Sequence, residues 1–272
     1  MAIGFGPILV RLSEVGPSAT AFWRVALALP LMFLWARLSR GGFTKLHAGG
    51  WGMLALVGAL FATDLALWHW GIKYTTVANA TLEANLAAIF VTLLAWLIFR
   101  QRVSRGFLVA MGVALLGTAL LVGKNAHITP DTLKGDMLGV LSAVFYGGYL
   151  LTAKVARERG INTFTMMIVS GLFTAAVLLP AAWLSHEKIV PVTTHGWLAV
   201  VALAIVSQFA GQTLIAYALA RLPAAPAALG LLLQPATAAV AAWAILHESL
   251  SPAQLLGGVI LLVGLWMARR AA

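Results

Sequence analysis

The chain contains no cysteine, which excludes disulfides, thiolate metal sites and cysteine nucleophiles. Charge is also scarce: charged residues make up 10% of the 272 positions, and only eight of them are acidic. A soluble domain of this size would need far more charge to cover its surface. Hydrophobic residues make up 61% of the chain, and the mean hydropathy is +0.95. This composition predicts an all-α membrane protein that needs no metal and no cofactor.

Apolar stretches joined by short loops fill almost the whole sequence. A hydrocarbon core about 30 Å thick takes roughly 20 helical residues. Ten such spans are predicted, at residues 1–12, 18–38, 51–72, 77–99, 106–122, 135–156, 163–184, 196–220, 224–246 and 252–268. The first is too short to cross, so we expect a truncated first helix with native residues missing before Met1. It lacks the basic start of a signal peptide.

The 18 basic residues are distributed unevenly along the predicted loops. With a cytoplasmic N-terminus, twelve fall on the inner side, five on the outer side and one, Arg24, within a span. Cytoplasmic loops of membrane proteins carry such an excess, so both termini are predicted to be cytoplasmic. The net charge of +10 is thereby explained by topology, and no nucleic-acid partner is expected.

The two halves of the chain show a weak internal repeat. Aligning residues 147 apart pairs Trp96 with Trp243, Ser104 with Ser251 and Gly117 with Gly264. Two five-helix repeats are therefore predicted, at residues 1–125 and 126–272. Because five is odd, the second repeat must enter the membrane inverted. Inverted repeats are typical of secondary transporters, whose substrate site lies near the midplane between the halves.

Several motifs, in this order, resemble those of one transporter family. They are Pro7-Ile8-Leu9-Val10-Arg11, Ala21-Phe22-Trp23-Arg24, Asp64 followed by Trp68-His69-Trp70-Gly71-Ile72, Val77-Ala78-Asn79-Ala80-Thr81-Leu82, Gln234-Pro235, and His247-Glu248-Ser249-Leu250-Ser251 with Gln254 and Gly257. Over nearly the full chain the sequence is similar to the drug/metabolite transporter (DMT) superfamily of EamA type. It departs from that pattern at Ala88, often proline, at Gln101, often Glu, and at Glu83, usually apolar.

The resemblance implies ten helices in two inverted repeats and a carrier of the bacterial inner (plasma) membrane. It implies export by alternating access through a cavity bounded by spans 1, 3, 4, 6, 8 and 9. The YddG-like exporters of aromatic amino acids are the most similar group, so the expected substrate is an aromatic or other amphipathic amino acid or a related metabolite. Alternatives are a broad-specificity drug, metabolite or nucleoside-type permease and, remotely, an intramembrane enzyme. The expected partners are the small-molecule substrate and the lipid bilayer, and a monomer is expected.

Three ionisable residues fall inside predicted spans at similar depth: Arg24, Asp64 and Glu83. Each costs at least about 2.5 kcal/mol in the membrane, so such groups usually face the interior and have a partner. One interpretation is a structural ion pair between Arg24 and one carboxylate. The other is that all three meet and that the spare carboxyl group, Asp64 or Glu83, couples protons or binds an amine.

Helical spacing adds aromatic and hydrogen-bonding residues to the candidates for the cavity wall. The candidates are Asp64, Trp68, Asn79, Glu83, Leu86, Phe90, Tyr146, Tyr149, Gln208, Gln212 and Gln234. Such a lining suits a small amphipathic or zwitterionic molecule. The alternative is that Trp68 belongs to the interfacial belt and that the glutamines only bridge helices.

Catalytic signatures are absent from the sequence. His247-Glu248 lacks the second histidine of a zinc-protease motif, and neither a G-x-S-x-G elbow nor a G-x-x-x-x-G-K-[ST] phosphate loop occurs. An enzyme or a directly ATP-driven pump is therefore not predicted.

Overall fold

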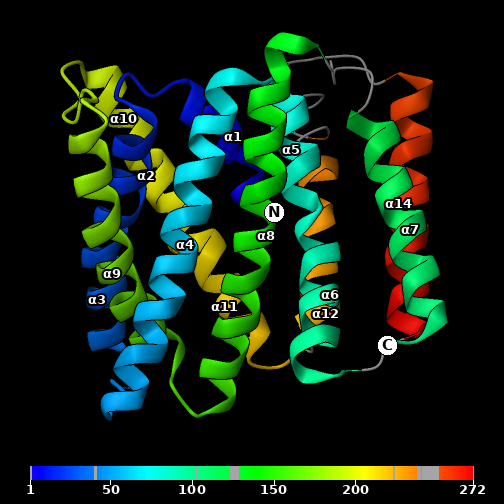
Figure 1. Cartoon of the computed structure of the whole chain (residues 1–272), viewed down its shortest axis with the longest axis horizontal. Coiled ribbons are helices and arrows are strands. Elements are labelled where there is room, and N and C mark those ends of the chain that lie inside the picture. Colours follow the sequence, from blue (N-terminus) through cyan, green and yellow to red (C-terminus); the bar gives the residue numbers. More distant parts are fainter. Residues whose placement is uncertain are drawn as a thin grey trace.

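A computed structural model describes residues 2–39, 42–101, 103–122, 129–222, 224–237, 240 and 251–271. Over these residues the regular structure is entirely helical (Figure 1). The elements are η1 (Ala2–Phe5), α1 (Gly6–Arg11), α2 (Pro17–Ala26), α3 (Ala28–Leu38), α4 (Ala48–Tyr74), α5 (Val77–Asn85), α6 (Ala87–Phe99), α7 (Arg105–Val122), α8 (Pro130–Glu158), α9 (Thr163–Leu184), α10 (Thr194–Ala202), the π-helix η3 (Leu203–Gln212), α11 (Thr213–Leu219), α12 (Ala224–Leu229), η4 (Gly230–Leu232) and α14 (Pro252–Ala271).

Within the described residues, eight stretches of helix are long and apolar enough to cross a membrane. They are Pro17–Leu38, Ala48–Tyr74, Ala78–Phe99, Arg105–Val122, Thr132–Glu158, Thr163–Leu184, Thr194–Leu219 and Pro252–Ala271. Each matches one predicted span, which confirms the all-α membrane fold. The predicted first span is the short apolar helix Ala2–Arg11. The predicted ninth span, 224–246, lies partly outside the described residues.

Two of the long spans are interrupted near their middle. The first break follows Ala26, where the carbonyl loses its helical partner because Pro30, four residues on, has no N–H. The second is at Leu86, between α5 and α6. There the Asn85 side chain donates to the Thr81 carbonyl at 2.7 Å and competes with the backbone ladder. The breaks place short helix ends inside the bundle.

Helix α4 is held between two neighbours by small residues. A Cβ atom at Gly58 would lie 2.5 Å from the Ser170 carbonyl oxygen of α9, and one at Gly135 of α8 would lie 2.6 Å from the Thr75 nitrogen just beyond α4. Thr174 also donates to the Gly58 carbonyl at 3.0 Å. Such close approach is how helices associate in lipid, where apolar side chains gain nothing by avoiding the solvent. Helix α4 is thereby held between α9 and α8 (Figure 1).

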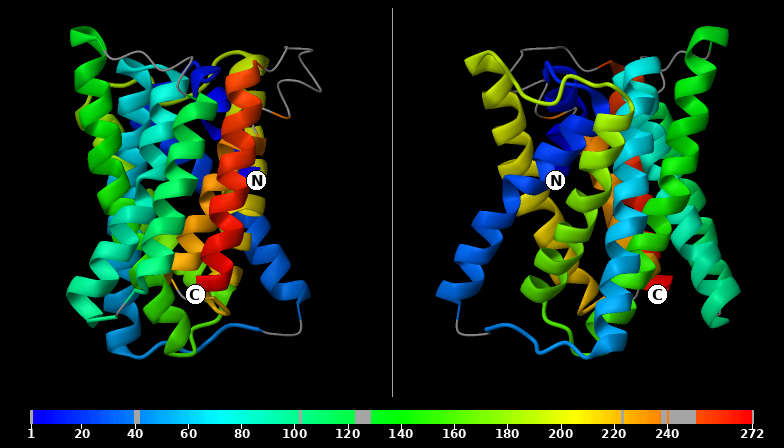
Figure 2. Two further views of the ribbon diagram at one scale, coloured as in Figure 1. Left: turned by 90° about the vertical axis from the view of Figure 1, so that its right-hand side faces the viewer. Right: turned by 60° about the vertical axis from the view of Figure 1, so that its left-hand side comes forward.

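Helices α7 and α14 form an antiparallel pair at one side of the molecule (Figures 1 and 2). A Cβ atom at Gly117 would lie 2.7 Å from the Leu261 Cα, and one at Gly264 would lie 2.7 Å from the Ala114 Cα. These contacts are reciprocal. Gly264 lies 147 residues after Gly117, and Ala114 lies 147 residues before Leu261. An isologous two-fold interface has this property.

The same shift relates the N-terminal caps of these two helices. The Ser104 hydroxyl accepts from the Phe107 N–H at 3.1 Å, and the Ser251 hydroxyl accepts from the Gln254 N–H at 3.3 Å. Each serine satisfies a backbone donor that the first turn of its helix leaves unpaired. The start of α7 lies beside the end of α14, since Ser104 also donates to the Ala271 carbonyl. The two helices therefore cross the bundle in opposite directions.

Substituting Gly257 with alanine tests the α7–α14 packing. A Cβ there would lie 2.6 Å from the Leu121 nitrogen and 2.8 Å from the Gly117 oxygen, so backbone must shift. We expect Gly257→Ala to destabilise the protein by about 1–3 kcal/mol, read as a lower melting temperature in detergent. The control Gly112→Ala, which meets nothing within 4 Å, should melt at or above the wild-type temperature. Equal melting of both variants would contradict the close approach.

Candidate functional site

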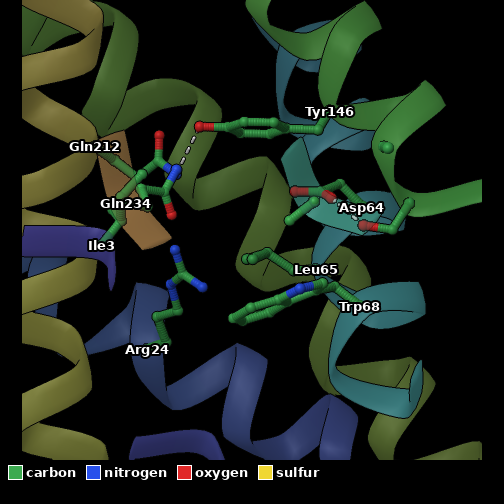
Figure 3. A pocket seen from close by; sticks show the side chains of 11 residues that line it. Ile3, Arg24, Asp64, Leu65, Trp68, Tyr146, Gln212 and Gln234 are labelled. Atoms are coloured by element: carbon green, nitrogen blue, oxygen red, sulfur yellow. Dashed lines mark hydrogen bonds between the residues drawn. The ribbon is translucent and has the colours of Figure 1, made fainter. Parts of the chain in front are cut away.

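A polar cavity of about 50 Å³ lies inside the bundle (Figure 3). We call it the central cavity. It is lined by Ile3, Arg24, Asp64, Leu65, Trp68, Ala84, Ser142, Ala143, Tyr146, Gln212 and Gln234. These residues come from η1, α2, α4, α5, α8, η3 and the helical residues 233–237. Both halves of the chain therefore contribute to its wall.

Arg24 is the cation of the central cavity and is only 4% exposed. Its Nε donates to the Gln208 Oε1 at 3.2 Å, and its guanidinium carbon lies 5.9 Å from the centre of the Trp68 ring. Among the described residues, neither predicted carboxylate comes within ion-pair distance of it. The predicted structural ion pair is therefore wrong. The physical reason is that Gln208 and Trp68 hold the guanidinium, while Asp64 is bound elsewhere.

Asp64 is the acidic side chain of the same cavity, and it is 7% exposed. Its Oδ1 accepts from the Ser142 hydroxyl of α8 at 2.6 Å. Figure 3 shows Arg24 and Asp64 on different sides of the space, with Trp68 below. Two opposite charges that face one cavity without touching form a fixed dipole. A molecule with an anionic and a cationic end could complement both.

Tyrosines and amides complete the polar wall. The Gln212 Nε2 donates to the Tyr146 hydroxyl at 3.3 Å (Figure 3). Tyr146 stacks on Tyr149 at 5.6 Å between ring centres, and Tyr149 stacks on Phe61 at 4.5 Å. Tyr149 thus lies behind Tyr146 rather than on the cavity surface. It buttresses the ring that faces the cavity.

Glu83 and Asn79 of α5 lie in a second polar group, together with Asp136 of α8. Glu83 lies close to Asp136, and the proximity of two carboxyl groups in a partly buried place favours a proton on one of them. Asp136 also accepts from Asn79 at 2.9 Å and from the Thr75 hydroxyl. The predicted meeting of Glu83 with Arg24 and Asp64 is therefore wrong, because the helical face of Glu83 packs against Gly139 of α8.

The other predicted lining residues also divide between those at the central cavity and those that lie elsewhere. Gln234 and Trp68 line the central cavity, and Gln208 acts through Arg24. Leu86 and Phe90 pack into the hydrophobic core instead, and Phe90 contacts Gly147 of α8. The predicted face of span 4 thus turns toward α8, so that Ala84 is its contribution to the cavity.

Sequence reasoning missed Ile3, Leu65, Ala84, Ser142 and Ala143 of the wall, and Asp136 of the second polar group. Ser142 carried a usable signal, since it precedes Tyr146 by four residues and therefore shares its helical face. The others are apolar or lie at a span end, where nothing in the sequence distinguishes them.

Two larger cavities flank the central one at opposite ends of the bundle. The upper vestibule, about 500 Å³, lies between residues 10–20, the end of α4 and residues 185–188. The lower vestibule, about 580 Å³, lies between the ends of α6 and α8 and the residues Arg221, Leu222 and Ala224. The central cavity has room for only a few water molecules, whereas sites for small organic ligands usually measure about 300–1,000 Å³.

The loops around the upper vestibule are tied by Glu14. Its carboxylate accepts from the Thr193 N–H at 2.8 Å, from the Thr193 hydroxyl at 3.0 Å and from the Val192 N–H, and Lys188 lies 3.9 Å away. The Thr193 backbone bond is the largest cause that lowers the pKa of Glu14, against an opposing contribution from burial. A loop of the first half is thereby fastened to a loop of the second.

Comparison with known proteins identifies this arrangement. A bundle of membrane-spanning helices around a buried polar cavity defines the class of membrane transporters. The EamA-like transporter family model matches residues 1–123 and again residues 133–270. The chain belongs to this EamA-like transporter family of the DMT superfamily, and it is a multi-pass membrane protein, as predicted.

Curated relatives are about one quarter identical to this chain. An uncharacterized transporter of Archaeoglobus fulgidus is 25% identical over 96% of this chain and 90% of its own. A probable terminal-alkyne amino-acid exporter of Streptantibioticus cattleyicolor is 26% identical over 99% and 89%. The pseudopaline exporter CntI of Pseudomonas aeruginosa is 26% identical over 68% and 63%. A protein of known crystal structure aligns with a TM-score of 0.79 over 99% of this chain and 96% of that one; at 19% identity it shares the fold.

The Glu83–Asp136 bond predicts different effects for two substitutions of Glu83. An amide at this position still donates to Asp136, so Glu83→Gln should melt close to the wild-type temperature. Glu83→Leu removes the donor and should destabilise the protein by about 1 kcal/mol. Thermal unfolding in detergent measures both. If Glu83→Gln were as unstable as Glu83→Leu, a hydrogen bond from Glu83 to Asp136 would be contradicted.

Glu14 predicts a defined dependence of stability on pH. Because the folded-state pKa lies below the usual value of about 4.3, the stabilisation is present above that pH and is lost as the pH falls through the lowered pKa. Glu14→Gln should therefore lower the melting temperature at neutral pH and flatten its decline below about pH 4.3. Glu158→Gln, at the opposite face, serves as control and should leave the decline unchanged. If the melting temperature of Glu14→Gln declined with falling pH as steeply as that of the wild type, this role of Glu14 would be contradicted.

Proposed function

We propose that this protein exports amino acids, aromatic or otherwise amphipathic, or related small zwitterionic metabolites by alternating access through the central cavity. The observation that carries the proposal is the pair of opposite charges, Arg24 and Asp64, facing one buried cavity. A substrate carboxylate matches the guanidinium, and a substrate ammonium matches the Asp64 carboxylate. Trp68 and Tyr146 supply aromatic surface for an apolar side chain.

Alternating access is supported by the arrangement of the three cavities. A small polar centre between two larger vestibules needs only a modest helix movement to join one vestibule or the other. The breaks at Ala26 and Leu86 and the π-helical stretch Leu203–Gln212 supply joints beside the cavity. Local departures from α-helix of this kind recur at functional sites.

The predicted repeats at 1–125 and 126–272 remain a prediction with two supports. The family model matches the chain twice, and the α7–α14 contacts are reciprocal at a spacing of 147 residues. Inversion of the second repeat would let the halves exchange conformations across the membrane, which is the usual basis of alternating access in such folds. The relatives named as exporters favour export as the direction.

A nucleoside-type permease is the second candidate, and it is less well matched. A neutral nucleoside carries neither a carboxylate nor an ammonium, so it would leave Arg24 and Asp64 without partners in a low-dielectric site. Buried charges without partners are costly. We therefore favour the zwitterion.

Counterflow in liposomes containing only this protein tests the proposal. The panel is L-phenylalanine, its decarboxylated analogue 2-phenylethylamine, its deaminated analogue 3-phenylpropanoate, and uridine. We expect exchange of the amino acid, and about 10- to 100-fold lower exchange in Asp64→Asn and Arg24→Gln, since a hydrogen bond to a charged group contributes about 1.5–3 kcal/mol.

The matched control is Arg159→Gln, which changes an exposed charge just beyond the lower end of α8. It should exchange at the wild-type rate. Each variant is first checked for a single folded species by gel filtration and melting. Counterflow of uridine alone, or equal counterflow in Asp64→Asn and Arg159→Gln, would overturn the zwitterion assignment.

A further inference from the structure

The upper vestibule is about ten times larger than the central cavity and adjoins it along α4. Trp68 lines the central cavity, and the next residue, His69, lines the upper vestibule. The volume of about 500 Å³ is in the range of sites for small organic molecules. One helical turn thus separates a space large enough for an amino acid from the charges of the central cavity.

Basic side chains line the upper vestibule, and two of them, Arg11 and Lys73, form no ion pair with a carboxylate within the described residues. Lys188 lies beside Glu14. Arg11 instead donates to the Thr75 carbonyl, and the Lys73 ammonium lies 4.9 Å from the centre of the Trp70 ring. Within the described ranges, neither has an acidic residue at ion-pair distance. Two such cations on one cavity form a receptor for a carboxylate.

An acceptor for a cation lines the same cavity. The Glu187 Oε2 accepts from the Ala19 N–H at 2.9 Å, whereas its Oε1 is buried and has no partner among the described residues. The His69 Nε2 is likewise buried and unbonded, while its Nδ1 lies 2.6 Å from the Leu65 carbonyl oxygen. Buried polar atoms usually have a partner, so each such atom on a cavity wall points to a ligand.

We propose that the upper vestibule is a second binding site for the transported zwitterion, which it holds next to the central cavity. Arg11 and Lys73 bind the carboxylate, Glu187 Oε1 accepts from the ammonium, and the Trp70 ring covers the apolar side chain. The inference rests on the proposed function for the identity of the ligand. It assigns to these residues a role separate from that of Arg24 and Asp64. The site serves as a staging point on the path between the central cavity and the upper face.

Titration calorimetry of the purified full chain tests this site without requiring transport. The Asp64→Asn variant is used as background, so that the central cavity contributes little to binding. L-phenylalanine should bind to it, and 2-phenylethylamine and 3-phenylpropanoate should each bind about tenfold more weakly. Adding Lys73→Gln or Arg11→Gln should weaken phenylalanine binding about tenfold, and Arg11→Lys should restore it.

The chain offers a matched control for Lys73. Lys134 is also a lysine at the upper face with its ammonium over an aromatic ring, 4.5 Å from the centre of Tyr74, but it does not line the upper vestibule. Lys134→Gln should therefore leave binding unchanged. Glu187→Gln should weaken phenylalanine but not 3-phenylpropanoate, because only the former carries an ammonium.

Each outcome separates the staging site from the proposed function. Equal effects of Lys73→Gln and Lys134→Gln, or no binding of phenylalanine to the Asp64→Asn variant, would overturn the staging site even if counterflow is normal. Binding that depends on Lys73 and Glu187 without any counterflow would support the site and overturn the transport proposal. Binding of 3-phenylpropanoate as tight as that of phenylalanine would replace the zwitterion by a simple carboxylate and overturn the role of Glu187.

Discussion

A charge inside an apolar bundle must be held by polar partners, and the centre of this structure depends on that constraint. Arg24 is held by an amide and an aromatic ring, and Asp64 is held by a hydroxyl. Neither charge is neutralised by the other. Because the field between them acts in a low dielectric, it is strong, and it is directed across the cavity. Arg24 and Asp64 would destabilise a core that had no cavity. In our proposal, these two groups determine which ligand fits the central cavity.

Small residues set the distances between the helices that carry these charges. Gly58 and Gly135 bring α9 and α8 against α4, so that Ser142 reaches Asp64. At the side of the bundle, Gly117 and Gly264 bring α7 and α14 into reciprocal contact. Where every neighbour is as apolar as the lipid, close backbone packing supplies the attraction that water supplies in soluble proteins. The glycines therefore fix the frame, and the polar residues fix the site.

The sizes of the three cavities describe a molecule closed around its centre. About 50 Å³ cannot hold an amino acid, whereas both vestibules can. The substrate binding that we propose at the centre would require helices to separate, and the helices are already interrupted beside Arg24 and Ala84. The bonds of Glu14 and Glu187 tie residues 13–19 to residues 187–193, so the loops at the upper face move together.

Hydrophobic run length by itself determined the helices, because a backbone in lipid must pair its own polar groups within the segment. The eight long spans and the burial of Arg24 and Asp64 followed from local sequence. Only the tertiary structure decided which polar groups meet. Asp64 finds Ser142 78 residues away, and Arg24 finds Gln208 184 residues away. Helical spacing fixes which side chains share a face, but the rotation of each helix against its neighbours is set by packing, and that rotation turned Glu83 toward Asp136.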